Sequence, residues 1–187
     1  MNVLLDCGSN LGQGYEKLSK ELGITPDWWV YMFEPNEKCV SFLKKKYPDL
    51  HVINKAVWTS YGQRRLMIQY CMVNKDWNGG ATNIMEDDYI KPKYINESHL
   101  KYNGYVGCLD FSKFLRVLFR EEDNLIVKFD IEGAEFDVLD KMIIDKTILL
   151  VDTIYVEWHN KLVYNRKDKS YYIKYFQENH INYKEWF

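Results

Sequence analysis

The chain has 187 residues, of which 47% are hydrophobic and 28% charged, and its formal net charge at pH 7 is −2. This length suits one domain with a substantial core, residues 1–187, and the composition is that of an ordinary globular protein. The small negative charge argues against nucleic acid or an anionic membrane surface as the main partner.

Cysteine spacing and hydropathy restrict the compartment. Cys7, Cys39, Cys71 and Cys108 stand apart, and none forms a CxxC pair, which argues against a zinc knuckle or a redox pair. Isolated thiols fit a reducing, cytoplasmic environment. Asp6 interrupts the first apolar run, and no later run is long enough to span a bilayer. We therefore expect neither a secretion signal nor a membrane span.

The first third of the chain alternates predicted strands with predicted helices. Apolar runs predict strands at 3–5, 29–33 and 51–53. Between them, apolar residues at helical spacing predict one helix that ends at Gly23 and another that follows Pro35. This β-α-β-α-β order predicts parallel strands joined by right-handed crossovers, and hence an α/β fold.

The rest of the chain is less regular. Residues 65–71 predict an antiparallel strand, and 74–105 form a polar stretch without a clear period, expected to be a functional loop with a flexible turn at 79–83. A helix capped by Asp110 or Ser112 follows. The remaining predicted elements are a buried strand at 125–129, a helix behind it, a strand at 153–158, a helix at 169–178 and a strand at 182–187.

The first predicted turn, Asp6-x-Gly8-x-Asn10-x-Gly12, is a candidate ligand site. It lacks two of the three glycines of a dinucleotide fingerprint, and no Gly-Lys-Ser/Thr of a Walker loop follows. Its glycines allow close approach to the backbone, Asp6 suits an ammonium group, and helix N–H groups suit a carboxylate. A ligand with both groups is an amino acid, such as the methionyl part of S-adenosylmethionine. The alternative is a tight turn that binds no ligand.

Glu34 ends the second predicted strand, where a carboxylate can accept hydrogen bonds from two ribose hydroxyls. Residues 54–57 follow the third predicted strand at the same edge of the sheet. By position they are expected to border the adenine.

Carboxylates gather after the buried strand 125–129, at the edge where open α/β sheets bind ligands. Asp130 and Glu132 follow that strand, and His159 lies just beyond Glu157 at the end of the next. Asp130, Glu132 and His159 are therefore the candidate catalytic residues, each as a general base or as a group that holds a substrate. Glu135 is expected to interact with the first turn of its helix.

A divalent cation is the alternative use of these side chains. Such an ion, for example Mg²⁺, would bind two sugar oxygens and lower the pKa of a hydroxyl. His159 also has the plain interpretation of a surface histidine. The candidate ligands are Asp130, Glu132, Glu157 and His159.

Taken together, these segments resemble the FkbM-like family of S-adenosylmethionine-dependent methyltransferases. The matching runs keep the family's order and read LLDCGSNLG (4–12), FEP (33–35), NKAV (54–57), GCLD (107–110) and VKFDIEGAE (127–135). The resemblance implies a Rossmann-like class I methyltransferase fold, here minimal at both ends, that transfers methyl to oxygen. The donor contacts expected on it are Asp6, Gly8, Ser9, Asn10, Gly12, Glu34, Pro35, Asn54, Ala56, Val57 and Asp130.

The expected acceptor is a hydroxyl of a sugar or glycan. Aromatic residues make up 16% of the chain and their faces can pack on sugar rings, although core packing explains most of them. The alternatives are a natural-product or nucleic-acid hydroxyl, or a binding module without catalysis. The short ends suggest either a minimal protein or a domain of a longer chain, fused for example to a glycosyltransferase-type domain. The aromatic residues expected near the site are Trp58, Trp77, Tyr94, Tyr102, Tyr105, Trp158 and Tyr164.

Overall fold

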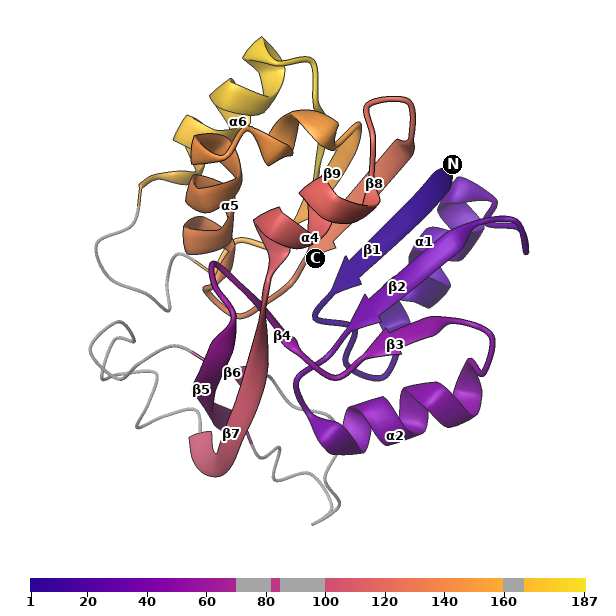
Figure 1. Cartoon of the computed structure of the whole chain (residues 1–187), viewed down its shortest axis with the longest axis vertical. Helices are drawn as coiled ribbons and strands as arrows, with labels where there is room; N and C mark the ends of the chain where they lie inside the picture. Colours follow the sequence, from indigo (N-terminus) through magenta and orange to yellow (C-terminus); the bar gives the residue numbers. More distant parts are fainter. Residues whose placement is uncertain (70–81, 85–99, 160–166) are drawn as a thin grey trace.

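A six-stranded parallel sheet forms the centre of the molecule (Figure 1). The structure is a computed structural model that describes residues 1–69, 82–84, 100–159 and 167–187. The strand order is β10-β9-β8-β1-β2-β3, and every neighbouring pair is parallel, which confirms the expected α/β fold. The strands are β1 (Asn2–Cys7), β2 (Trp29–Phe33), β3 (His51–Ile53), β8 (Asn124–Phe129), β9 (Thr153–Val156) and β10 (Asn182–Glu185).

Helices cover both faces of this sheet. They are α1 (Gln13–Leu22), α2 (Glu37–Lys46), α4 (Phe111–Leu118), α5 (Glu135–Ile144) and α6 (Lys169–Glu178), with the 3₁₀ turn η2 (Thr147–Leu150) after α5. Leu18 of α1 and Leu43 of α2 pack with Leu4 on one face. The helices α4, α5 and α6 pack on the other face, with Leu5. Among these helices, none has the length and apolar composition needed to cross a bilayer.

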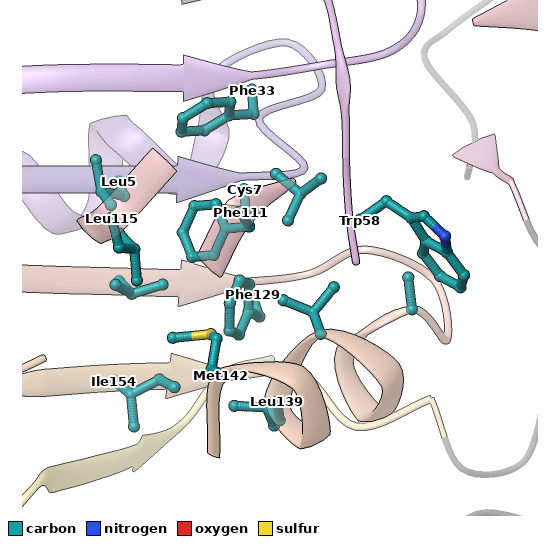
Figure 2. Packing of buried hydrophobic residues seen from close by; sticks show 14 of the residues in the cluster. Leu5, Cys7, Phe33, Trp58, Phe111, Leu115, Phe129, Leu139, Met142 and Ile154 are labelled. Carbon is teal, nitrogen blue, oxygen red and sulfur yellow. The ribbon is translucent and has the colours of Figure 1, made fainter. Parts of the chain in front are cut away.

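The larger core lies between the main sheet and the helices α4 and α5 (Figure 2). Phe111 meets Phe129 edge to face, with ring centroids 5.4 Å apart, and meets Phe33 at 5.9 Å. Each such fully buried side chain contributes about 1.5–3 kcal/mol. Figure 2 shows Phe33, Cys7 and Phe129 close to the arrowheads of their strands. The core therefore fixes the points at which the loops after β1, β2 and β8 begin.

A second, smaller sheet lies beyond the carboxyl ends of the main strands (Figure 1). Its order is β4-β7-β5-β6, with β4 parallel and β5 antiparallel to β7. Its strands are β4 (Ala56–Trp58), β5 (Gly62–Gln69), β6 (Thr82–Asn83) and β7 (Leu100–Asp110). Val57, Leu66 and Val106 are buried in the same core as β1 and β8, so this sheet is anchored beside the edge where the main strands end.

The structure corrects the expectation of one long loop at 74–105. β7 begins at Leu100 and pairs with β5, and Thr82 and Asn83 form β6. The polar residues Asn103 and Gly104 obscure the apolar alternation of β7 in the sequence. Residues 79–81 of the expected turn lie outside the described residues. The antiparallel strand expected at 65–71 is confirmed as β5, with an earlier start.

Other boundaries differ by a few residues. The strand expected at 153–158 ends at Val156, and the strand expected at 182–187 ends at Glu185. The cap of α4 is Asp110, whose Oδ1 accepts a hydrogen bond from the Lys113 N–H at 2.9 Å. Gly23 ends α1 in the left-handed conformation, as expected.

Candidate functional site

The turn between β1 and α1 forms the centre of the candidate site. Gly8, Asn10 and Gly12 all have left-handed backbone, with φ of 81°, 48° and 92°. A Cβ atom at Gly8 would lie 1.8 Å from the backbone oxygen of Asp130. Ser9 is buried and its hydroxyl donates to the backbone oxygen of Asp6 at 2.7 Å. Glycine is therefore required at position 8 because the turn touches the loop that follows β8.

Glu34 is buried at the end of β2, and its carboxylate fastens two turns. Its Oε2 accepts the Asn10 N–H at 2.8 Å, and its Oε1 accepts the Asn36 N–H at 2.9 Å. Each oxygen keeps a second lone pair for a further donor. Burial raises the pKa of Glu34 to about 7, although the two backbone hydrogen bonds lower it. The side chain is thus a pre-oriented acceptor for hydroxyl groups.

A cavity opens between the first turn, Glu34 and the small sheet. This first cavity encloses about 610 Å³, its open mouth included. Asn54 stands outside it and supports the wall, because its Nδ2 donates to the backbone oxygens of Glu34 and Pro35, each at 3.0 Å. Lys55 also lines the cavity. The predicted site residues that line it are Gly8, Asn10, Glu34, Pro35, Ala56, Val57, Asp130 and Glu132.

Lys128 is a buried cation that joins the two central loops. Its Nζ donates to the backbone oxygen of Gly8 at 2.9 Å and lies 3.1 Å from Asp6 Oδ1 and 3.2 Å from Asp130 Oδ2. Burial lowers the pKa of Lys128, but Asp6 and Asp130 more than compensate and raise it above its usual range. Asp6 is fully buried and lines neither this cavity nor the second one described below, and its cationic partner in the structure is the Lys128 ammonium.

The loop between β8 and α5 is held in an unusual conformation by Glu135. Glu132 and Gly133 have φ of 55° and 100°, and a left-handed glutamate is uncommon. The fully buried carboxylate of Glu135 accepts the N–H groups of Ile131 and Gly133, both at 2.9 Å. Glu135 thus bonds the loop ahead of its helix, rather than only the helix end as expected. This bonding turns Glu132 toward the first cavity.

His159 lies beside the carboxylates of this loop. Its Nδ1 is 2.7 Å from Glu135 Oε1, and its Nε2 is 3.4 Å from Glu132 Oε2 and 3.7 Å from Glu157 Oε1. Burial lowers the pKa of His159, but Glu135 and then Glu132 outweigh it and raise it to about 10. Burial and the neighbouring acids raise the pKa of Glu132 to about 7, against the effect of His159.

Three of the four candidate metal ligands lie within reach of one ion. One ligand atom from each of Asp130, Glu132 and His159 lies within 4.8 Å of the others. The Nδ1 of His159 is occupied by Glu135, which leaves Nε2 on the side of Glu132. A carboxylate behind a histidine in this way is typical of metal-binding histidines. The donor set of oxygen and imidazole nitrogen fits a divalent cation.

A second cavity adjoins the first and shares Gly8, Asn10 and Asp130 with it. It encloses about 670 Å³, its open mouth included. Ser9 of the predicted set lies here. Gly12 lines neither cavity, and a Cβ there would lie 2.7 Å from the Tyr47 ring. The charged residues of this cavity are Lys17, Lys128, Asp130 and Glu157.

Two site residues were missed by the sequence predictions, Lys128 and Glu135. Lys128 interrupts the apolar run of β8, and that interruption was the available signal because a buried lysine needs partners. Glu135 gave no separate signal, since an acid in the first turn of a helix is common.

Two of the aromatic residues expected near the site, Trp58 and Trp158, pack in the larger core. Trp58 is buried, with the guanidinium of Arg64 4.1 Å from its ring centroid. Trp158 donates its Nε1–H to the Tyr183 hydroxyl at 2.9 Å, and Tyr105 is 66% exposed. Trp77, Tyr94, Tyr164 and the side chain of Tyr102 lie outside the described part of the chain.

Comparisons with known proteins found a family model and a solved structure. Residues 6–180 match a family model described as a methyltransferase FkbM domain. A solved structure of methyltransferase FkbM from Methylobacillus flagellatus KT is similar, with 14% sequence identity and a TM-score of 0.45. The alignment covers 80% of the present chain and 31% of the M. flagellatus protein, so the present chain spans about a third of the length of that protein. No curated protein matched.

Proposed function

The chain belongs to the FkbM family of methyltransferases, and on this premise we propose that it transfers the methyl group of S-adenosylmethionine to a hydroxyl oxygen of a sugar or glycan. The observation that carries this proposal is the pair of adjoining cavities that meet at Gly8, Asn10 and Asp130. One holds the buried acceptor Glu34, which suits ribose hydroxyls, and the other holds both lysines and carboxylates, which suit a zwitterion. S-adenosylmethionine combines a nucleoside with a zwitterion.

The transfer is an in-line displacement. The acceptor oxygen forms a bond to the methyl carbon while the carbon–sulfur bond breaks, which leaves S-adenosylhomocysteine. The hydroxyl proton passes to a base. We assign that base to Glu132, because it lines the first cavity beside Asp130 and is turned into it by the loop. A positioned base contributes about 10²–10⁴-fold, and orientation of the two reactants contributes more.

His159 has a supporting role in this scheme. Its imidazolium lies 3.4 Å from Glu132 and is fixed from behind by Glu135, so it stabilises the ionised carboxylate. Asp130 is the charged residue that both cavities share, and it lies next to Lys128. We therefore assign it to the donor's ammonium group.

A divalent cation is the second candidate for activation of the acceptor. It is favoured by the convergence of Asp130, Glu132 and His159, whose ligand atoms lie within 4.8 Å of one another. Bound there, a cation would polarise an acceptor hydroxyl and lower its pKa. Methyl transfer in the presence and absence of a chelator separates the two routes: activity that survives chelation assigns the proton to Glu132 alone.

Calorimetric titration with S-adenosylmethionine and S-adenosylhomocysteine tests the donor, and a protein that binds neither would end the proposal. Labelled methyl transfer to a panel of neutral sugars, amino sugars and a polyphenol then tests the acceptor. We expect an ether on a sugar hydroxyl, lost when that hydroxyl is replaced by hydrogen. Transfer only to the polyphenol would favour a natural-product acceptor.

The buried thiols of Cys7, Cys39 and Cys108 support assignment to a reducing cytoplasm.

A further inference from the structure

The second cavity contains a lysine that none of the sequence motifs includes. Lys17 lies in the second turn of α1, and its side chain forms part of the cavity lining. Its ammonium lies 4.2 Å from the ring centroid of Trp186, the residue that follows β10. Within the described part of the chain no carboxylate lies at ion-pair distance from Lys17, and Glu21, one turn further along α1, interacts with it over a longer distance. Other lysines differ: Lys46 and Lys184 pair with glutamates.

The amino-terminal end of α1, one turn before Lys17, adds to the preference of the second cavity for an anion. The amino-terminal end of a helix carries partial positive charge, so a cation close to it is destabilising and an anion is stabilising. The cap of α1, Gly12, contributes no side-chain hydrogen bond to the first N–H groups of the helix. An anion in the second cavity would complement both the helix end and Lys17.

Trp186 fixes where this ammonium is held. Trp186 is 7% exposed, its ring packs edge to face on Tyr155 at 6.0 Å, and its backbone N–H donates to the Val156 oxygen at 3.0 Å. Lys128 Nζ lies 5.6 Å from the centroid of the same ring. A cation over the face of tryptophan is attracted to it, which restrains the flexible Lys17 side chain at the cavity.

The two cations that line the second cavity differ in whether the protein already neutralises them. Lys128 is already balanced by Asp6 and Asp130, at 3.1 and 3.2 Å. Lys17 is therefore the cation left for a ligand anion, while Asp130 and Glu157 are the carboxylates that line the same space. An α-amino acid group fits this division, with its ammonium at the carboxylates and its carboxylate at Lys17.

We propose that Lys17, held by Trp186, binds the α-carboxylate of the methyl donor and makes the site selective for donors that carry one. The inference rests on the proposed function, because it takes S-adenosylmethionine as the ligand. It adds a specificity residue from outside the glycine-rich turn. Lys17 touches neither the methyl group nor the acceptor, so its effect falls on donor affinity.

The test compares two donors that differ only in the carboxylate, S-adenosylmethionine and its decarboxylated form, by calorimetric titration of the whole chain. A charge-assisted hydrogen bond implies that wild type prefers the carboxylate-bearing donor by about ten-fold or more. Lys17→Met should weaken binding of that donor by about ten-fold and leave the decarboxylated donor within about two-fold. The matched control is Lys20→Met, on the same helix and outside the cavity lining, which should leave both affinities within two-fold.

Equal weakening of both donors by Lys17→Met, or no weakening of either, would overturn the assignment while leaving the proposed function in place. Wild-type protein that binds neither donor would instead remove the proposed function itself. Circular dichroism of both variants establishes that they fold. Lys17 is exposed on its helix, so replacement by methionine leaves the core intact.

Discussion

The contact between Gly8 and the backbone of Asp130 provides the sharpest test of the site's architecture. In Gly8→Ala, the new Cβ would lie 1.8 Å from the Asp130 oxygen, whereas real Cβ atoms essentially never come closer than 3.0 Å to another heavy atom. The two loops must therefore separate by more than about 1 Å, well beyond the small shifts that a packed interior absorbs. The chain also supplies a matched control. Gly23 has φ of 63°, and a Cβ added there would meet no atom of the described residues within 4 Å.

The magnitude follows from the difference between these two glycines. Both variants place alanine in the left-handed region, at a cost of about 1–2 kcal/mol each. Gly8→Ala additionally strains three hydrogen bonds that hold the loops: Asp130 N–H to Cys7, Gly8 N–H to Phe33, and Lys128 Nζ to Gly8. Loss of one or two of these costs about 1–3 kcal/mol. We therefore expect Gly8→Ala to be less stable than Gly23→Ala by about 2 kcal/mol.

Urea unfolding followed by circular dichroism measures both free energies of unfolding, and calorimetry measures affinity for S-adenosylhomocysteine. Gly8→Ala should lose at least about 10²-fold in affinity, because both cavities meet at this residue, whereas Gly23→Ala should stay within two-fold. If the two variants unfold within about 0.5 kcal/mol of each other, the close approach of the two loops is refuted.

Three further predictions concern buried charges. Glu34→Gln should weaken donor binding about 10–100-fold. In the wild type, affinity for the donor should fall as the pH drops through about 7, because protonation of Glu34 removes an acceptor for the ribose hydroxyls. A wild-type affinity that does not change with pH would contradict this. Lys128→Met should lower the free energy of unfolding, measured in urea, by about 3–5 kcal/mol, because it leaves Asp6 buried without a cation. The double variant with Asp6→Asn should recover part of that loss, and no recovery would argue against an ion pair between Asp6 and Lys128. Glu135→Gln should lower the pKa of His159 from about 10 by ~1 or more, because it removes the charge nearest to the imidazolium. An NMR titration of His159 with a chelator present measures this pKa. An unchanged value would reject Glu135 as the dominant partner of His159.

Much of the fold followed from local patterns. The strands β2 and β3 were predicted with the observed boundaries because apolar runs end at clear turn residues. The β7 strand was missed, since its pairing depends on β5, about 40 residues earlier in the sequence, rather than on its own periodicity. At the site, the meeting of Gly8, Glu34 and Asp130 followed from the rule that parallel strands end at one edge. The pairing of Asp6 with Lys128 and the hold of Glu135 on His159 depend on side-chain direction, which the sequence pattern did not specify.

The bond from Lys128 to Gly8 joins residues that are 120 positions apart in the chain. It exists only when β8 has paired with β1, in the register that sets Asp6 opposite Lys128. Contacts of such long sequence separation form late, because a large loop must close before they are gained. During refolding, donor binding should therefore appear after helical structure has formed, and the methyl-donor site becomes a reporter of the final docking of the two halves of the sheet.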